Sequence, residues 1–157
     1  MSTLRRAALT AGLLACTLPL AAQSAPEKDA ILAVTARLFD GMRAGDSAMV
    51  RSTLHPKAAS ATAFIRQGTP TVQVEDGMDD FVKAVGTPHD KVYDERVANP
   101  VVQQDGNLAA VWMDYTFYLG DQKSHCGVDA FLLAKDSDGW KIISIADTRR
   151  RDGCPDL

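Results

Sequence analysis

The sequence has few of the residues that build metal centres, redox motifs or phosphate-binding loops. It contains three cysteines, with no Cys-x-x-Cys pair, and three scattered histidines, His55, His89 and His125, so zinc-site spacing is absent and we expect no metal. Neither a Gly-rich phosphate loop nor a Gly-x-Ser-x-Gly elbow occurs, and nothing points to a cofactor. The net charge of −3 provides no electrostatic footprint for nucleic acid, so we expect no such partner.

Aromatic residues are also scarce, at 6%, but 46% of the 157 residues are hydrophobic and 24% are charged. This composition and length are typical of one ordinary domain that buries a core. The short basic run Arg149-Arg150-Arg151 is interpreted as a solvated or salt-bridged strand end, because the chain as a whole is acidic.

Residues 1–24 have the pattern of a secretory signal peptide. Arg5 and Arg6 precede an uncharged stretch rich in Ala and Leu, and Ala22-Gln23-Ser24 places small residues where a signal peptidase reads. We therefore predict a mature domain over 25–157 that is periplasmic or secreted, has a net charge of −5 after loss of two Arg, and has no stable membrane insertion. Two alternatives are a buried N-terminal helix and lipidation of Cys16.

Signal cleavage leaves Cys126 and Cys154 as the cysteines of the mature chain. In an exported protein two cysteines most simply form one disulfide, and two buried free thiols are the alternative.

The first part of the mature chain has helical periodicity. Apolar residues from Ile31 to Met42 recur at helical spacing, and Asp46 is placed to cap a second, short helix that ends near Leu54. Two short strands are expected at 59–66 and 71–75, and a third helix runs from Met78 to a stop at Gly86.

From residue 92 the period changes to two. We expect long strands at 93–104, 108–119, 124–135 and 140–150, with a bulge at Asn99-Pro100 because proline removes one ladder donor. The predicted fold class is α+β, with three helices covering one face of a strongly curved, mainly antiparallel sheet.

The order of these elements, and four segments near the C-terminus, resemble the nuclear transport factor two-like superfamily. The segments are Leu108–Tyr115, Ser124–Asp129, Gly139–Ile142 and Thr148–Arg151. The chain looks like the exported bacterial branch, close to the SnoaL-like and polyketide cyclase-like groups. The resemblance implies a cone-shaped fold with a pocket between helices and sheet, and a homodimer. It implies no single activity, because members include enzymes, binding proteins and assembly domains.

Strand register predicts which residues face the pocket. We assume a two-residue turn at Gly120-Asp121 and a three-residue loop at 137–139, which place Trp112 opposite Asp129 and Asp129 opposite Asp147. A mixed face then collects Trp112, Asp114, Tyr118, His125, Asp129, Phe131, Ile145, Asp147 and Arg149. The other face, nearly all apolar, collects Val111, Met113, Tyr115, Phe117, Cys126, Val128, Ala130 and Leu132.

We therefore predict that Trp112, Asp114, Tyr118, His125, Asp129, Phe131 and Asp147 bind a small apolar or amphipathic molecule. Within this set Asp114, His125, Asp129 and Asp147 are the catalytic candidates, because neighbouring carboxyls raise each other's pKa and histidine carries protons near neutral pH. The alternatives are structural: ion pairs of the aspartates with Arg96, Arg149 or Arg150, and a structural hydrogen bond of His125 beside the disulfide.

Two function classes follow from this face. One is an exported small-molecule-binding or accessory domain, which we favour, and the other is an enzyme of isomerase, cyclase or dehydratase type that transfers protons in the same pocket. A third, weaker possibility is an interaction domain whose cavity is filled by Trp112 and Phe131. The steroid isomerase branch of the superfamily has a Tyr in its first helix, and residues 29–43 contain none. The epoxide hydrolase branch has an Arg between two Asp side chains in its pocket, whereas Arg96 points away from the pocket on the assumed register. Neither activity is therefore expected here.

Overall fold

The computed structural model describes residues 25–157, so the predicted signal segment lies outside the described residues. Three helices precede or interrupt the sheet: α1 (Ala25–Ala44), α2 (Ser47–Thr53) and α3 (Asp79–Gly86). Asp46 caps α2, its side chain accepting a hydrogen bond from the backbone N–H of Met49 at 2.8 Å, as the sequence predicted.

Six strands form one sheet. Their order in space is β2-β1-β6-β5-β4-β3, and every neighbouring pair is antiparallel except β1 and β6. The strands are β1 (Leu54–Arg66), β2 (Thr69–Glu75), β3 (Tyr93–Asp105), β4 (Leu108–Leu119), β5 (Gln122–Asp136) and β6 (Gly139–Arg149). β1 begins at Leu54, earlier than the expected residue 59, because Leu54 pairs with Ile142 of β6.

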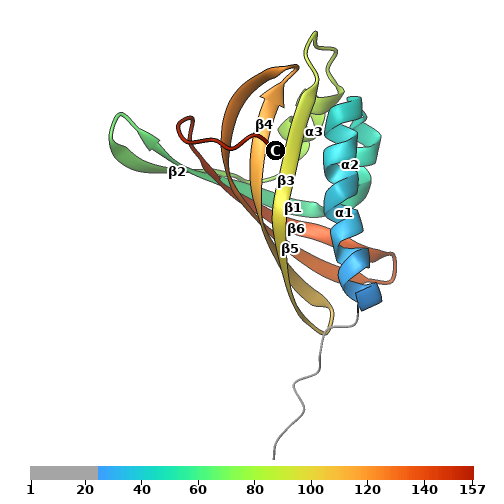
Figure 1. Ribbon diagram of the computed structural model, residues 1–157. Coiled ribbons are helices and arrows are strands. Elements are labelled where there is room, and N and C mark those ends of the chain that lie inside the picture. Colours follow the sequence, from blue (N-terminus) through green and yellow to red (C-terminus); the bar gives the residue numbers. More distant parts are fainter. Residues whose placement is uncertain (1–24) are drawn as a thin grey trace, which may run out of the picture.

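The sheet curves around the helices and the two layers enclose the core, as Figure 1 shows. α1 lies along the concave face, and the β1–β2 hairpin extends away from the helices. Buried residues from both layers form the core, among them Ile31, Leu38, Phe39, Met42, Val85, Val111, Met113, Phe131, Leu133 and Ile142. The predicted α+β fold class, three helices on a strongly curved and mainly antiparallel sheet, is confirmed.

A bulge in β3 decides which of its residues face the helices. The pairing of β3 with β4 shifts between Ala98 and Val101, where Asn99 adopts a φ of 53°. This confirms the bulge predicted at Asn99-Pro100. The extra residue reverses the alternation, so that Glu95, paired with Phe117, faces the concave side and Arg96 faces the convex side.

The predicted register of β4 against β5 is wrong by one residue. The turn at Gly120-Asp121 has the expected two residues, since Leu119 pairs with Gln122. The pairing then shifts at Ser124, so that Trp112 lies opposite Ala130 rather than Asp129. Because the side-chain period of a strand is two, this single extra residue moves the β4 side chains to the other face.

The predicted pairing of β5 with β6 is confirmed, although the turn differs from the expectation. Asp129 pairs with Asp147 and Phe131 with Ile145. The turn has two residues instead of three, because Asp136 pairs with Gly139. A one-residue shift of the pairing between Leu132 and Leu133 then produces the same register that a three-residue loop would give.

The disulfide predicted between Cys126 and Cys154 is present, with the two Cα atoms 5.5 Å apart. It ties the C-terminal segment to the convex face of the sheet. There the Thr116 hydroxyl donates to the Pro155 carbonyl at 3.1 Å, and the Arg96 guanidinium donates to the Leu157 carbonyl at 3.0 Å.

None of the helices described over residues 25–157 combines the length and the apolar character required to cross a membrane.

Candidate functional site

A cavity of about 150 Å³ lies between α1, α3 and the concave face of the sheet. Its apolar wall comes from Leu38, Phe39, Met42, Met78, Phe81, Phe131 and Ile145. Its polar end comes from Ser60, Thr62, Glu95, Tyr115, Asp129, Asp147 and Arg149. An apolar cavity of this size in another protein holds one benzene ring. The site therefore suits a compact apolar body with a polar group at one end.

Tyr115 reaches the polar end because its partner across the sheet is a glycine. Tyr115 pairs with Gly127, and a Cβ atom at Gly127 would collide with the carbonyl oxygen of Thr148. The close approach of β5 and β6 at this point brings the Thr148 carbonyl within 3.0 Å and Asp147 Oδ2 within 3.2 Å of the Tyr115 hydroxyl. Burial, followed by the charge of Asp147, raises the pKa of Tyr115, so its hydroxyl stays a donor.

Asp129 is the most deeply buried acidic residue at the cavity, with 3% of its surface exposed. Its Oδ2 receives no hydrogen bond from any N–H or O–H group of the described residues. Its carboxyl group lies within hydrogen-bonding range of the Glu95 carboxyl group. A hydrogen bond between two carboxyls requires a proton on one of them, so this contact is favourable when one of the two carboxyls is protonated.

The electrostatics of this pair agree with a shared proton. Burial, and then the charge of Glu95, raises the pKa of Asp129 well above its usual range. Burial, with the repulsion of Asp147, likewise raises the pKa of Glu95 to about 7, against the opposing effects of the Asp129 hydrogen bond and Arg149. At neutral pH the pair can therefore both donate and accept a hydrogen bond.

Asp147, beside the pair, is saturated with hydrogen bonds. Its Oδ1 accepts from the Thr62 hydroxyl at 2.6 Å, and its Oδ2 is 3.4 Å from Arg149 Nε in addition to the Tyr115 contact. The alternative of an ion pair thus holds for Asp147 and Arg149, whereas no Lys or Arg pairs with Asp129 among residues 25–157.

His125 lies on the concave side but does not border the cavity. Its ring packs against Tyr115 and Phe117, with centroids 5.8 and 5.0 Å away, and its Nδ1 is 3.0 Å from the Ser124 hydroxyl. Burial, and then the charge of Arg149, lowers the pKa of His125 to about 4. The imidazole is therefore neutral near pH 7, and it lies behind Tyr115 rather than among the residues that line the cavity.

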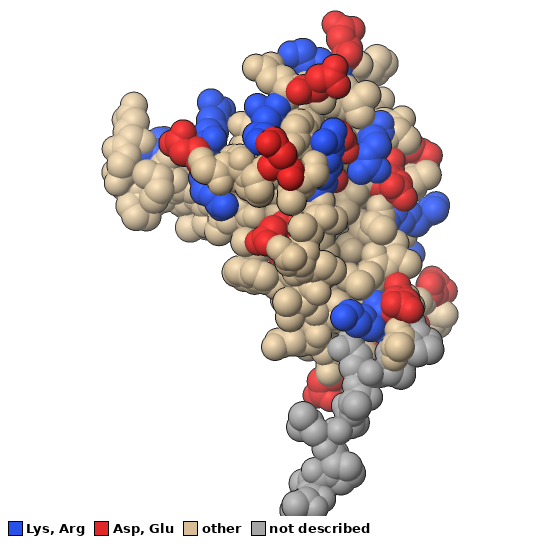
Figure 2. Space-filling model, viewed as in Figure 1, with Lys and Arg blue, Asp and Glu red and all other residues tan. Residues whose placement is uncertain are grey.

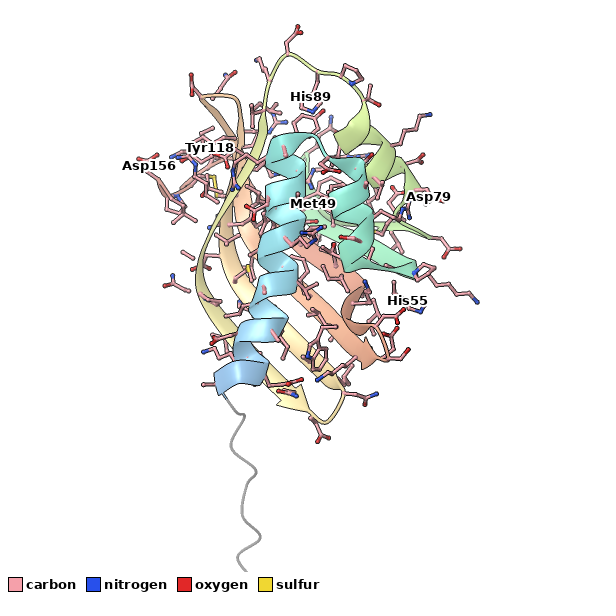
Figure 3. All side chains as sticks on the ribbon, turned by 90° about the vertical axis from the view of Figure 1, so that its right-hand side faces the viewer. Met49, His55, Asp79, His89, Tyr118 and Asp156 are labelled. Carbon is pink, nitrogen blue, oxygen red and sulfur yellow. A yellow bond between two sulfur atoms is a disulfide. The ribbon has the colours of Figure 1, made fainter. Side chains whose placement is uncertain are left out.

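Three of the predicted cavity residues lie on the convex face. Trp112 is 55% exposed, and the Asp114 carboxylate accepts a hydrogen bond from the Asn99 amide at 2.8 Å. Tyr118 is buried under the C-terminal segment, where the Arg96 guanidinium stacks on its ring at 4.1 Å; Figure 3 shows Tyr118 beside the segment that carries Asp156. Trp112 therefore does not fill the cavity, and the cause is the register shift at Ser124.

Of the mixed face predicted from register, the structure places Asp129, Phe131, Ile145, Asp147 and Arg149 at the cavity. The sequence analysis missed Glu95 and Tyr115, as well as the helix side chains. Glu95 could have been found, because counting the alternation of β3 through the Asn99-Pro100 bulge turns it inward. Within residues 25–157, no group of three or more His, Cys, Asp or Glu side chains is arranged to hold a metal ion.

These features define a class of fold: a cone-shaped α+β domain with its cavity between helices and sheet, which solved proteins described as NTF2-like or cystatin-like share. Within this class, residues 26–146 match the family described as "Putative lumazine-binding". The chain belongs to that family.

Solved structures of several bacterial proteins share the fold. An NTF2-like protein from Shewanella baltica is 16% identical with a TM-score of 0.62, and the match covers 81% of this chain and 96% of that chain. A protein described as a putative dehydratase from Streptomyces avermitilis is 14% identical with a TM-score of 0.58, covering 80% and 97%. The beta subunit of a putative aromatic-ring-hydroxylating dioxygenase from Novosphingobium aromaticivorans is 11% identical with a TM-score of 0.64, covering 78% and 88%. No curated protein matches in sequence.

Proposed function

We propose that this protein is an exported binding or accessory domain that holds a small, apolar-bodied molecule in the cavity. The observation that carries the proposal is the buried Asp129 carboxyl, which lines the cavity and whose Oδ2 has no hydrogen-bond partner among residues 25–157. A buried polar atom without a partner costs free energy, which a ligand with a matching polar end recovers.

The polar end of the ligand follows from the shared proton. A carboxyl pair with one proton presents a donor beside an acceptor, which complements an adjacent N–H and C=O in a ring. The description of the family supports such a ligand, since lumazine is a heteroaromatic compound with N–H and C=O groups along one edge. The domain that we propose therefore binds compact heterocycles of this kind.

The test is a titration of the mature protein with lumazine, followed by its fluorescence and by calorimetry. We expect Asp129→Asn to weaken binding about tenfold, the loss of one hydrogen bond worth about 1.4 kcal/mol. Asp114→Asn is the matched control, because Asp114 lies on the convex face. Equal binding by both variants, or no binding to the unmodified protein and no small molecule retained after purification from a periplasm, would contradict the proposal.

Export supports an accessory role outside the cytoplasm. The signal pattern of residues 1–24 and the Cys126–Cys154 disulfide are both typical of a periplasmic or secreted protein. N-terminal sequencing of the exported protein tests this, and an intact Met1 or a lipid on Cys16 would contradict it.

We further propose a homodimer formed through the convex face. Val101, Trp112 and Leu132 are 56%, 55% and 43% exposed there, around the small residues Ala110 and Ala130. Figure 2 shows a surface over the lower part of the sheet that is nearly free of charged side chains. Exposed apolar patches of this kind mark protein interfaces. We expect Trp112→Glu to produce monomers in analytical ultracentrifugation, and an unchanged mass would refute this face.

The alternative function is an enzyme that transfers protons in the same cavity. It is favoured by one observation, the raised pKa of Glu95, because a carboxyl that titrates near neutral pH is an effective general base or acid. Solvent deuterium exchange into small cyclic ketones, measured by NMR, tests this function. Exchange that disappears in Glu95→Gln and persists in Asp114→Asn would favour the enzyme over the binding domain.

A further inference from the structure

The cavity adjoins a larger groove of about 700 Å³, which has Thr62 and Arg149 in common with it. The groove runs between the β1–β2 hairpin and the segment that follows β6. Phe64 supplies an aromatic wall on the hairpin side, and Arg150 and Arg151 supply the opposite side. A molecule seated in the cavity can therefore extend past Arg149 into this groove.

The groove concentrates positive charge on an acidic protein. Arg149, Arg150 and Arg151 all border it, with Asp152 as the acidic residue among its lining, although the chain carries a net charge of −3. The side chain of Arg149 is 49% exposed, and its contact with Asp147 is long, at 3.4 Å. Among residues 25–157, no salt bridge involves Arg150 or Arg151. Figure 2 shows basic side chains gathered near the base of the hairpin.

The positive charge of the groove also affects the pKa of the neighbouring His125. Arg149 and Arg151 both contribute to the low pKa of His125, so both guanidinium groups act on the same small region. The guanidinium group is the side chain best suited to carboxylates and phosphates, because its planar N–H groups bind two oxygens at once. The arginines that line the groove thus supply the chemistry of an oxyanion subsite.

The arrangement of charge along the site sets the orientation of the ligand. The inner end of the cavity carries Glu95, Asp129 and Asp147, and the outer groove carries the arginines. An anionic group is repelled by the inner end and attracted by the outer groove. A cationic ligand would bind in the opposite orientation, with its charged group at the inner end.

We propose that the ligand is an organic anion whose ring lies in the cavity and whose carboxylate or phosphate group is bound by Arg149 and Arg151. This inference rests on the proposed function, since it names the class of molecule that the same site takes. It also reverses the interpretation of Arg149-Arg150-Arg151 made from sequence alone.

Four probes that share a phenyl body test the proposal: 3-phenylpropionate, 2-phenylethyl phosphate, 3-phenylpropan-1-ol and 3-phenylpropylamine. Their affinities are measured by NMR titration of the mature protein at low salt and at high salt. We expect at least one of the two anions to bind about tenfold more tightly than the alcohol, and the amine to bind most weakly. The tighter anion identifies the group, and its advantage should shrink at high salt.

Two variants locate the subsite. We expect Arg151→Gln to reduce the affinity for the tighter anion by about fivefold and to leave the alcohol unchanged, and Arg149→Gln to do the same more strongly. Arg51→Gln, which removes an arginine on α2 that pairs with Asp79, is the matched control. If Arg149→Gln unfolds through loss of its Asp147 contact, Arg151→Gln alone decides.

The outcomes separate this inference from the proposed function. If the alcohol binds in the cavity but neither anion gains affinity, or if the amine binds most tightly, the anion subsite is overturned and the binding function stands. If none of the four probes binds while lumazine does, the subsite is likewise overturned. If neither the probes nor lumazine bind, both proposals fail.

Discussion

The concave and convex faces of strands β4 and β5 differ in how their polar groups are satisfied. On the convex face three polar side chains have partners: Asp114 accepts from Asn99, Thr116 donates to Pro155, and Arg96 of β3 stacks on Tyr118. On the concave face Asp129 Oδ2 has no hydrogen-bond partner among the described residues, and burial, followed by the charge of Glu95, raises the pKa of Asp129. The buried polar atom without a partner, which a binding site requires, therefore lies on the concave face.

The largest expected effect comes from removing the covalent tie of the convex face. Cys126→Ala with Cys154→Ala opens a loop with a sequence separation of 28 residues, and we expect a loss of about 3.5 kcal/mol of unfolding free energy. Chemical denaturation measures the loss. If the two faces are independent, ligand affinity in the folded variant is unchanged; a matching loss of affinity would show that the faces are coupled.

Next in size is Gly127→Ala, which affects both faces at once. The new methyl group would collide with the Thr148 carbonyl, so we expect a loss of about 3 kcal/mol together with displacement of the Tyr115 hydroxyl. Thermal unfolding measures the loss. The double variant with Thr148→Ala is the control: rescue by it would show that the Thr148 side chain, not the backbone, is the obstacle.

The carboxyl pair on the concave face predicts an unusual pH dependence. Because the pKa of Glu95 is raised to about 7 and that of Asp129 is raised too, the folded state binds more protons than the unfolded state between about pH 4.5 and 7. The pair's contribution to stability is therefore complete below that window and declines as the pH rises through it.

Asp129→Asn removes the carboxyl repulsion, and we expect it to stabilise the protein by about 1 to 2 kcal/mol at pH 8 and by little at pH 4. Denaturant titrations at several pH values measure this. A large loss of stability at pH 8 would show instead that Asp129 is a structural ion-pair partner.

His125 predicts an opposite and smaller effect. Its pKa is lowered to about 4 in the folded state, so the unfolded state binds the extra proton as the pH falls below about 6.5. Stability from this group is present above that pH and declines on acidification, by about 1 kcal/mol. The same titrations on His125→Asn should flatten this acidic decline; an unchanged profile would exclude His125 as its source.

The smallest effect is expected for Asp114→Asn. A half-buried, hydrogen-bonded side chain on the convex face, away from the cavity, should change stability by less than about 0.5 kcal/mol and leave ligand affinity unaltered. If this variant alters binding, the assignment of Asp114 to the convex face is wrong.

The sequence alone determined the elements and the disulfide. Apolar spacing placed the helices, the turn at Gly120-Asp121 placed the adjoining strand ends, and the proline at position 100 predicted the β3 bulge. These signals are local, because each depends on the preferences of a few neighbouring residues. The pairing of Asp129 with Asp147 was also predicted, through an assumed loop length that happened to match a turn plus a bulge.

Only the tertiary structure decided which residues of β4 meet the cavity. The extra residue at Ser124 has no proline, glycine or charge pattern to announce it, yet it moves Trp112 and Asp114 outward and brings Tyr115 inward. The bulge arises where two long strands must follow a tightly curved sheet, which depends on the packing of the whole sheet around α1. A face that changes by one residue of register cannot be determined from alternation alone, because both choices satisfy the same local pattern.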